Sequence, residues 1–188
     1  MNKEAYRKLY KSKRKELSRE EIDEMSESIA TLLLHNFDFV GKKVHTFVSI
    51  SGKKEINTKF LVNQLFTIDC EVSTSITHLS PDYLEHTRIF SHTKYGFDSF
   101  GIPTPLEIHK VKEEDFDVVI VPLLCIDQVG HRIGYGKGFY DRFLAETKPN
   151  VIKIGLALNE PIEPIEDLNP FDVALDFTIT PLSIYRFR

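Results

Sequence analysis

The residues best suited to chemistry lie in one glycine-rich stretch, residues 130–142. Glycines at positions 130, 134, 136 and 138 can let the backbone approach an anion closely and turn its N–H groups toward it. Arg132 and Lys137 add two positive charges, and Asp141 could hold a divalent cation that bridges phosphate oxygens. The pattern therefore indicates anion binding, with a purely structural glycine turn as the alternative.

This stretch matches neither of two familiar nucleotide-binding signatures. Lys137 is followed by Gly138 rather than by Ser or Thr, so the stretch is not a P-loop, and it does not have GxGxxG spacing. A helix is expected to follow at Phe139, and its N-terminus would add partial positive charge. Composition and spacing alone do not identify the anion.

Two further sets of charged residues could take part. Lys3 and Arg7 lie four positions apart on an expected helix, so both could grip the same phosphate, although such pairs are commonly solvated surface residues. Glu55 lies between an expected strand and an expected helix, at the sheet edge where α/β proteins bind ligands. A favourable interaction with the helix dipole is its alternative role. For Asp172 a cap or turn role is the default.

The elements that must position these residues follow from hydrophobic periodicity and capping signals. Helices are expected over residues 3–16, from Ser18 to about His35, and from Asn57 or Thr58 through Leu65. A fourth is expected to run from Phe139 through Leu144 and to end before Pro149. Ser18 and Glu21 form a capping box, and Ala5, Leu9 and Tyr6 are expected to attach the first helix. Strands are expected at 44–50, 71–75, 88–90, 118–121, 151–158 and 177–180.

The order of these elements predicts the fold class. Residues 118–121 form a short apolar run that suits a central strand buried on both faces, and residues 91–107 form a long loop. Strands that alternate with helices favour a three-layer α/β fold with a largely parallel sheet flanked by helices. No linker or internal repeat interrupts the 188 residues, so we expect a single domain over residues 1–188.

Composition excludes several classes of protein. The formal net charge is -4, which offers no overall field for nucleic acid or an anionic membrane. No window approaches 18 apolar residues and the N-terminus has no signal-peptide core, so we expect a cytoplasmic protein that is neither secreted nor membrane-spanning. No obligate protein partner is evident from the sequence. Cys70 and Cys125 are expected to be reduced, and the seven histidines to be surface or structural. No Ser/His or Cys/His arrangement suggests a covalent nucleophile.

Taken in order, the motifs resemble the 5-formyltetrahydrofolate cyclo-ligase family over nearly the whole chain. The resemblance rests on Lys3-x-x-x-Arg7, Glu55-x-x-Thr58, Gly101-Ile102-Pro103-x-Pro105, Asp127-x-x-Gly130-x-Arg132, residues 134–142 and Phe171-Asp172. It implies a fold similar to that of the sugar-phosphate isomerase and CoA-transferase superfamily. It also implies that ATP and 5-formyltetrahydrofolate give ADP, phosphate and 5,10-methenyltetrahydrofolate, with Mg²⁺ as cofactor.

The resemblance also implies roles for individual residues. The ATP site would comprise Lys3, Arg7, Arg132, Ile133, Gly134, Tyr135, Gly136, Lys137, Gly138, Phe139 and Tyr140. The folate site would include Ile50, Glu55 and Tyr140, the metal ligands would be Asp141 and Asp172, and the catalytic residues would be Arg132, Lys137 and Tyr140. Two positions depart from the family: Phe139 stands where a second tyrosine is more frequent, and Phe100 where some relatives carry tryptophan.

Two alternatives stay open at this point. One is another enzyme of the same fold, a sugar-phosphate isomerase or a CoA-transferase-like protein. The other is a folate- or nucleotide-binding protein without catalysis. The cyclo-ligase interpretation requires the N-terminal helix and the glycine-rich stretch to meet in space, because both must hold one triphosphate.

Overall fold

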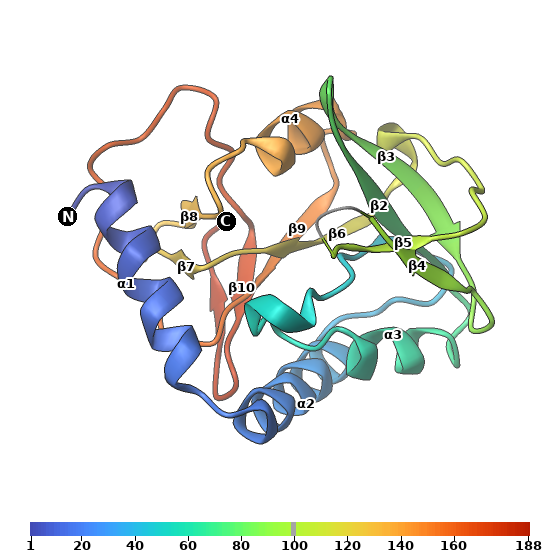
Figure 1. Cartoon of the computed structure of the whole chain (residues 1–188), viewed down its shortest axis with the longest axis horizontal. Helices are drawn as coiled ribbons and strands as arrows, with labels where there is room; N and C mark the ends of the chain where they lie inside the picture. Colours follow the sequence, from blue (N-terminus) through green and yellow to red (C-terminus); the bar gives the residue numbers. More distant parts are fainter. Residues whose placement is uncertain (99–100) are drawn as a thin grey trace.

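The chain folds around a seven-stranded sheet with strand order β11-β10-β9-β6-β1-β2-β3. The computed structural model describes residues 1–98 and 101–188 (Figure 1). The strands of this sheet are β1 Lys43–His45, β2 Glu71–Leu79, β3 Asp82–Ile89, β6 Val118–Pro122, β9 Ile152–Leu156, β10 Phe177–Ile179 and β11 Ile184–Arg186. The five inner strands are parallel, and the edge strands β3 and β11 are antiparallel to their neighbours.

Helices cover both faces of the sheet, so the predicted three-layer α/β class is confirmed (Figure 1). The helices are α1 Lys3–Glu16, α2 Arg19–Asn36, α3 Lys59–Leu65 and α4 Phe139–Glu146, with two short 3₁₀ turns at Ser51–Lys53 and Glu113–Asp115. Helices α2 and α3 pack on one face, and α4 packs on the other. The capping box predicted from Ser18 and Glu21 is present at the start of α2.

The predicted central strand holds these layers together. In β6, residues 118–121 are all buried, and the strand lies fourth of seven in the sheet. Ile120 contributes to the core shared with α2 and α3, whereas Val119 and Val121 contribute to the core shared with α4. Each such fully buried aliphatic side chain stabilises the fold by roughly 2 kcal/mol relative to an exposed one. A strand buried on both faces explains the continuous apolar run in the sequence.

The connections place the ligand-binding edge of the sheet. From β1 the chain passes through α3 to β2 on one side, and from β6 it passes through α4 to β9 on the other. The winding therefore reverses between β1 and β6, and open α/β sheets bind ligands at the carboxyl ends of strands flanking such a point. No helix in the described part of the chain has the length and apolar character needed to cross a bilayer.

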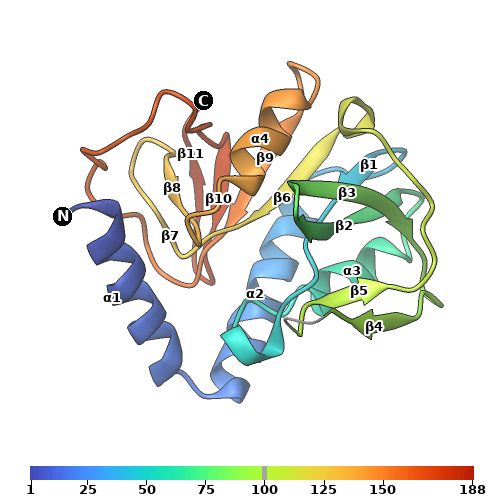
Figure 2. The same cartoon turned by 45° about the horizontal axis from the view of Figure 1, so that its top comes forward.

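Helix α1 lies outside the three layers, beside the small hairpin of β7 Cys125–Ile126 and β8 Arg132–Ile133 (Figures 1 and 2). Tyr10 packs into a hydrophobic cluster with residues of this hairpin, whereas Ala5 and Leu9 are exposed. The prediction that Ala5 and Leu9 attach α1 was therefore wrong. The helix buries a face that carries tyrosine and arginine, which a search for aliphatic periodicity does not detect.

Other predicted boundaries also shifted. The strand expected at 44–50 pairs regularly only at Lys43–His45, and the chain then leaves the sheet along its ligand-binding edge. Strands β2 and β3 form a longer antiparallel ribbon than expected, and the loop at 91–107 contains a second ribbon, β4 Tyr95–Phe97 with β5 Pro103–Pro105. Thr58 occupies the N-cap of α3, but its hydroxyl donates to the Phe47 carbonyl at 2.9 Å instead of capping the helix. The departure noted at Phe100 lies outside the described residues.

Two histidines are buried between the sheet and α4. His45 Nε2 lies 2.7 Å from Ser75 Oγ, and this hydroxyl lies 3.2 Å from His86 Nδ1. The rings of both histidines pack against Phe143 of α4. Burial lowers the pKa of His45 well below its usual value and that of His86 to about 4. Both imidazoles are therefore neutral near pH 7.

This pair predicts a loss of stability in mild acid. Both histidines regain ordinary pKa values on unfolding, so below about pH 6.5 the unfolded chain binds more protons than the folded chain. The stabilisation is complete above pH 6.5, and each imidazole should cost about 1.4 kcal/mol per pH unit as the pH falls toward 4. Urea unfolding at a series of pH values gives the slope of the unfolding free energy against pH. In His86→Gln this slope should be smaller than in the parent protein by the equivalent of about one proton. The exposed His92→Gln is the control, and equal slopes in both variants would contradict the assignment.

Candidate active site

A cavity of about 1380 Å³ opens at the carboxyl ends of β1, β2 and β6. It brings together α1, the segment after β1, the glycine-rich stretch and residues 167–173. The predicted site residues that line it are Lys3, Arg7, Ile50, Glu55, Arg132, Gly134, Tyr135, Gly136, Lys137, Gly138, Phe139, Tyr140, Asp141 and Asp172. Residues remote in the sequence thus share one cavity, in agreement with the topological argument.

Helix α1 and the glycine-rich stretch meet directly, as the sequence required. The Nε–H of Arg7 donates to the Gly134 carbonyl at 3.2 Å. Gly136 has a φ of +97°, and a Cβ there would lie 3.2 Å from the Arg7 guanidinium carbon. The glycine therefore provides a backbone conformation and a clearance that a larger residue would lose.

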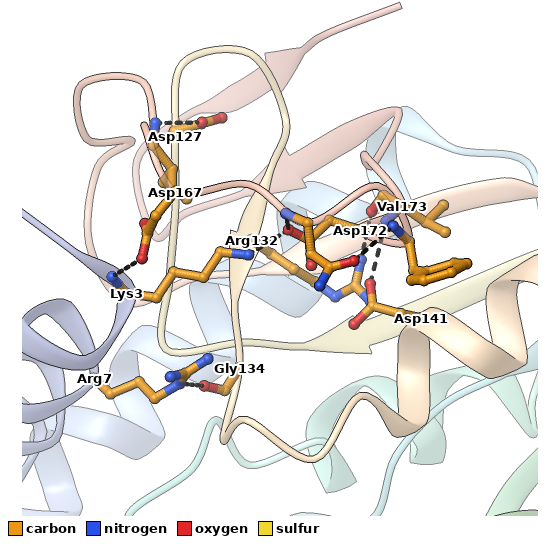
Figure 3. A network of polar contacts seen from close by, with 12 residues as sticks. Lys3, Arg7, Asp127, Arg132, Gly134, Asp141, Asp167, Asp172 and Val173 are labelled. Atoms are coloured by element: carbon orange, nitrogen blue, oxygen red, sulfur yellow. Dashed lines mark hydrogen bonds and ion pairs between the residues drawn. The ribbon is translucent and has the colours of Figure 1, made fainter.

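The charged residues of this corner form one network in which cations and carboxylates are already paired (Figure 3). The Lys3 ammonium is ion-paired with Asp172, and the backbone N–H of Lys3 donates to Asp167 at 2.9 Å. Arg132 Nη2 contacts Asp141 Oδ1 at 2.7 Å, and its Nη1 donates to the Val173 carbonyl at 2.6 Å. Lys3 and Arg132 therefore tie the segment at 167–173 to α1 and α4.

Burial and ion pairing act together on these groups. Burial of Asp172 by itself would raise its pKa, but hydrogen bonds from Lys3 and from the Asn169 N–H outweigh burial and bring the pKa below its usual value. Burial lowers the pKa of Arg132, and the neighbouring Asp141 partly offsets this shift. A guanidinium nevertheless stays protonated in proteins. Two basic side chains, Lys3 and Arg132, and two acidic side chains, Asp141 and Asp172, thus line the same cavity.

The start of α4 presents Lys137 to the cavity. Gly138 is the N-cap residue with a φ of 67°, a left-handed conformation that glycine adopts without steric cost. Lys137 is exposed on the cavity side, whereas the Arg142 side chain donates to the Lys137 carbonyl at 3.2 Å. The ring of Phe139 lies under the Arg142 guanidinium, 5.2 Å from ring centroid to guanidinium carbon. A flexible cation and a helix N-terminus therefore adjoin the glycine-rich backbone, an arrangement suited to phosphate.

Glu55 belongs to a hydrogen-bonded unit that joins the residues expected for folate to those expected for ATP. The Tyr135 hydroxyl donates to Glu55 Oε1 at 2.6 Å, and the Ile50 N–H donates to Oε2 at 2.7 Å. Burial, followed by the Glu55 charge, raises the pKa of Tyr135 above its usual value, so its hydroxyl stays protonated. The same two causes raise the pKa of Tyr140, so its hydroxyl also stays protonated near pH 7 and keeps a hydrogen to donate.

Ile133 differs from the other predicted site residues. Its side chain is 1% exposed and packs with Tyr10 and Leu124 in the cluster beneath α1, and it does not line the cavity. Its carbonyl accepts from the Leu124 N–H at 2.8 Å, within the segment that leads into β7. Ile133 therefore anchors the glycine-rich stretch to the hydrophobic cluster beneath α1 and does not face the cavity.

Several lining residues had no role assigned from the sequence. They include Lys53, Ser75, Arg142, Asp167 and Phe171, although Arg142 and Phe171 belong to the motifs quoted above. Phe171 lines the cavity with 82% of its surface exposed, and no periodicity marks an aromatic residue in a loop. Arg14 does not line the cavity but contacts Tyr135, and a signal for it existed: positions 3, 7 and 14 fall on one face of an α-helix.

No three His, Cys, Asp or Glu side chains gather into a metal site in the described part of the chain. Asp141 and Asp172 lie in the same network, each held by a cation. Mg²⁺ commonly binds one or two carboxylates and completes its shell with water and substrate phosphate oxygens. The two carboxylates fit such a partial site if a phosphate supplies further oxygens.

Comparison with known proteins decides the family. The model of the 5-formyltetrahydrofolate cyclo-ligase family matches residues 1–181. The chain belongs to this family. The 5-formyltetrahydrofolate cyclo-ligase of Escherichia coli K12 is 27% identical over 193 residues, which cover 95% of this chain and all of that protein. The 5-formyltetrahydrofolate cyclo-ligase of Mycoplasma genitalium is 32% identical over 99 residues, which span 59% of that protein.

Solved structures agree with this membership. The solution structure of Aquifex aeolicus 5,10-methenyltetrahydrofolate synthetase has a TM-score of 0.78 and 29% identity, with 100% of this chain and 94% of that chain covered. A 5,10-methenyltetrahydrofolate synthetase from Mycoplasma pneumoniae has a TM-score of 0.71 at 21% identity, which shows a shared fold. The likeness to the sugar-phosphate isomerase and CoA-transferase superfamily stays a prediction.

The paired charges predict how the site responds to a divalent cation without nucleotide. Lys3→Met removes the competing cation from Asp172, so the affinity for Mn²⁺ should rise roughly three- to tenfold. Free Mn²⁺ can be measured by electron paramagnetic resonance. Lys8→Met is the matched control, an exposed lysine on the same helix. Equal affinities in the two variants would show that Lys3 does not compete for this carboxylate.

Proposed function

We propose that the protein catalyses the ATP-dependent cyclisation of 5-formyltetrahydrofolate to 5,10-methenyltetrahydrofolate, with release of ADP and phosphate. One observation carries the proposal: α1 and the glycine-rich stretch converge on one cavity whose wall also contains Glu55, in a chain that belongs to the cyclo-ligase family. The cavity is large enough for both substrates, since ligand sites of about 300–1,000 Å³ hold drug-sized molecules.

We assign the triphosphate to the basic side of the cavity. Positive charge comes there from Lys3, Arg7, Arg132 and Lys137. The glycine-rich backbone at residues 134–138 lies beside them and would contact the phosphates. Asp141 and Asp172 would hold Mg²⁺ once Lys3 and Arg132 turn toward phosphate oxygens. A magnesium ion, when bound, neutralises charge that develops on the phosphoryl group.

We assign the folate to the side of the cavity formed by Ile50, Glu55 and Tyr140. A formamide oxygen is a poor leaving group, and transfer of the γ-phosphoryl group to it makes phosphate the leaving group. The N10 amine then forms a bond to the formyl carbon, phosphate departs with the C–O bonding electrons, and N10 loses its proton. This chemistry asks the protein mainly for positioning and charge neutralisation, in agreement with the clustered cations and the proton-bearing hydroxyl of Tyr140.

The other expectations are kept as proposals. We take the chain as a single cyclo-ligase domain over residues 1–188 that acts in the cytoplasm on small molecules. Nucleic acid, membranes and an obligate protein partner have no part in this proposal. Among the described residues, no contact within the cavity favours a sugar-phosphate isomerase or a CoA-transferase-like enzyme. A measurement of product formation distinguishes the proposed enzyme from a binding protein without catalysis.

Product formation tests the proposal directly. Purified protein mixed with MgATP and 5-formyltetrahydrofolate should produce the absorbance of methenyltetrahydrofolate together with one phosphate per product. Omission of either ATP or divalent cation should abolish the signal, because both participate in activating the formyl oxygen. Binding of both substrates by folded protein without product would instead support the non-catalytic alternative.

Lys137 offers the cleanest test of the assigned phosphate site. Lys137→Ala should lower turnover by a factor on the order of 100, because a cation aimed at the transferring phosphoryl group is lost. The unfolding free energy should change little, since this side chain is exposed. Arg132→Ala is less informative, because Arg132 also holds Asp141 and Val173.

Lys59→Ala is the control for Lys137→Ala. Lys59 is an exposed lysine in the first turn of α3 and does not line the cavity. It should therefore retain the parent turnover. Normal turnover in Lys137→Ala would remove Lys137 from the phosphate site.

A further inference from the structure

Arg14 is a buried cation that the proposed reaction does not use directly. It lies in the last turn of α1 with 7% of its surface exposed, and it does not line the cavity. Its Nη2 donates to the Leu123 carbonyl at 2.8 Å, and its Nη1 donates to the Tyr135 hydroxyl oxygen at 3.1 Å. A buried guanidinium is costly unless its donors are satisfied, so these contacts define where the side chain lies.

The direction of the hydrogen bonds is fixed by chemistry. Arginine has donors only, so the Tyr135 oxygen must accept from Arg14. The single hydroxyl hydrogen of Tyr135 is then directed to Glu55 Oε1, at 2.6 Å. Arg14, Tyr135 and Glu55 therefore form a hydrogen-bond chain. Each donor in it points the same way, from the buried cation to the buried carboxylate.

Glu55 is held from two directions at once. Tyr135 donates to Oε1, and the Ile50 N–H donates to Oε2 at 2.7 Å. Two short charge-assisted hydrogen bonds fix the plane of the carboxylate, while Glu55 still lines the cavity. Lys53 also restrains Tyr135, with its ammonium 4.8 Å from the ring centroid.

We propose that Arg14 is a positioning residue that orients the Glu55 carboxylate toward the substrate through the Tyr135 hydroxyl. Arg14 polarises the hydroxyl, and the hydroxyl then donates more strongly to Glu55. The positive charge also compensates the buried carboxylate without occupying the cavity. The inference rests on the proposed function, because it takes Glu55 as a contact of 5-formyltetrahydrofolate.

A double-mutant cycle tests this proposal. Tyr135→Phe removes only the hydroxyl and keeps the ring, and Arg14→Gln removes the charge but keeps an amide donor. Each single variant should raise KM for 5-formyltetrahydrofolate about tenfold, since a hydrogen bond to a charged group is lost. Arg14→Gln should change KM for ATP less than twofold. The double variant should be at most about twofold worse than the poorer single variant, because both break the same chain.

Lys13→Gln is the matched control. Lys13 is exposed, precedes Arg14 on α1 and lies over the ring of Tyr10, 4.8 Å from its centroid. It should leave both KM values unchanged. Additive losses in the double variant, or equal losses for ATP and folate in Arg14→Gln, would show a merely structural arginine and overturn the proposal.

Urea unfolding of the same four proteins makes the test independent of catalysis. The unfolding constants should be non-additive by a factor of several, because Arg14 and Tyr135 are in direct contact. Additive unfolding constants would overturn the hydrogen-bond chain even if turnover is normal. The two proposals can fail separately. If the unfolding constants are non-additive but the parent protein neither binds nor converts 5-formyltetrahydrofolate, the hydrogen-bond chain is supported and the proposed function is refuted. Glu55 is then no longer a folate contact.

Discussion

The contact between α1 and the glycine-rich stretch determines most of what the site can do. Arg7 reaches the Gly134 carbonyl, and Arg14 reaches the Tyr135 hydroxyl, so one helix face is attached at two successive residues of the stretch. The helix has little aliphatic surface, and its attachment depends on Tyr10 and on these polar contacts. The residues that bind the helix to the protein and the residues proposed to bind ATP therefore overlap.

The charged residues of the cavity also have two roles, one in the ligand-free fold and one in the proposed site. Lys3 and Arg132 hold Asp172 and Asp141, so the partly buried charges of the cavity are paired within the protein. Unpaired charges removed from water are costly, whereas paired charges could exchange partners with the triphosphate and the cation proposed to bind there. The site can thus be strongly charged without destabilising the ligand-free fold, and it is prepared for a ligand that brings both signs of charge.

The sequence predicted the architecture well where a single physical signal dominates. The continuous apolar run at 118–121 identified the central strand, and Ser18 with Glu21 identified the start of α2. Boundaries were poorer where tertiary contacts decide, as at Thr58, whose hydroxyl bonds to Phe47 in preference to its own helix. Helix propensity and capping rules consider only nearby residues in the sequence. The hydrogen bond of Thr58 could not be predicted from them, because its partner belongs to another segment of the fold.

The candidate site followed the same division. The cations and the glycines at 134, 136 and 138 were found from residue type and spacing, and the structure brings them to one cavity. The chain from Arg14 to Glu55 could not be predicted, because it joins residues 14, 135 and 55 through a tyrosine that looks like part of a loop. The helical spacing of Arg14 with Lys3 and Arg7 was the one signal available, and only the fold gives it meaning.

The separation of Arg7 and Gly134 along the chain has a consequence for biogenesis. Helix α1 is synthesised before its polar partners, and Gly134 follows Arg7 by 127 residues. Until then a short, highly charged helix has almost no apolar surface to hold it, and closing so long a loop costs entropy before any contact forms. The side of the cavity that we assign to ATP should therefore be among the last parts to assemble, so a chain that ends before the glycine-rich stretch would lack the proposed triphosphate site.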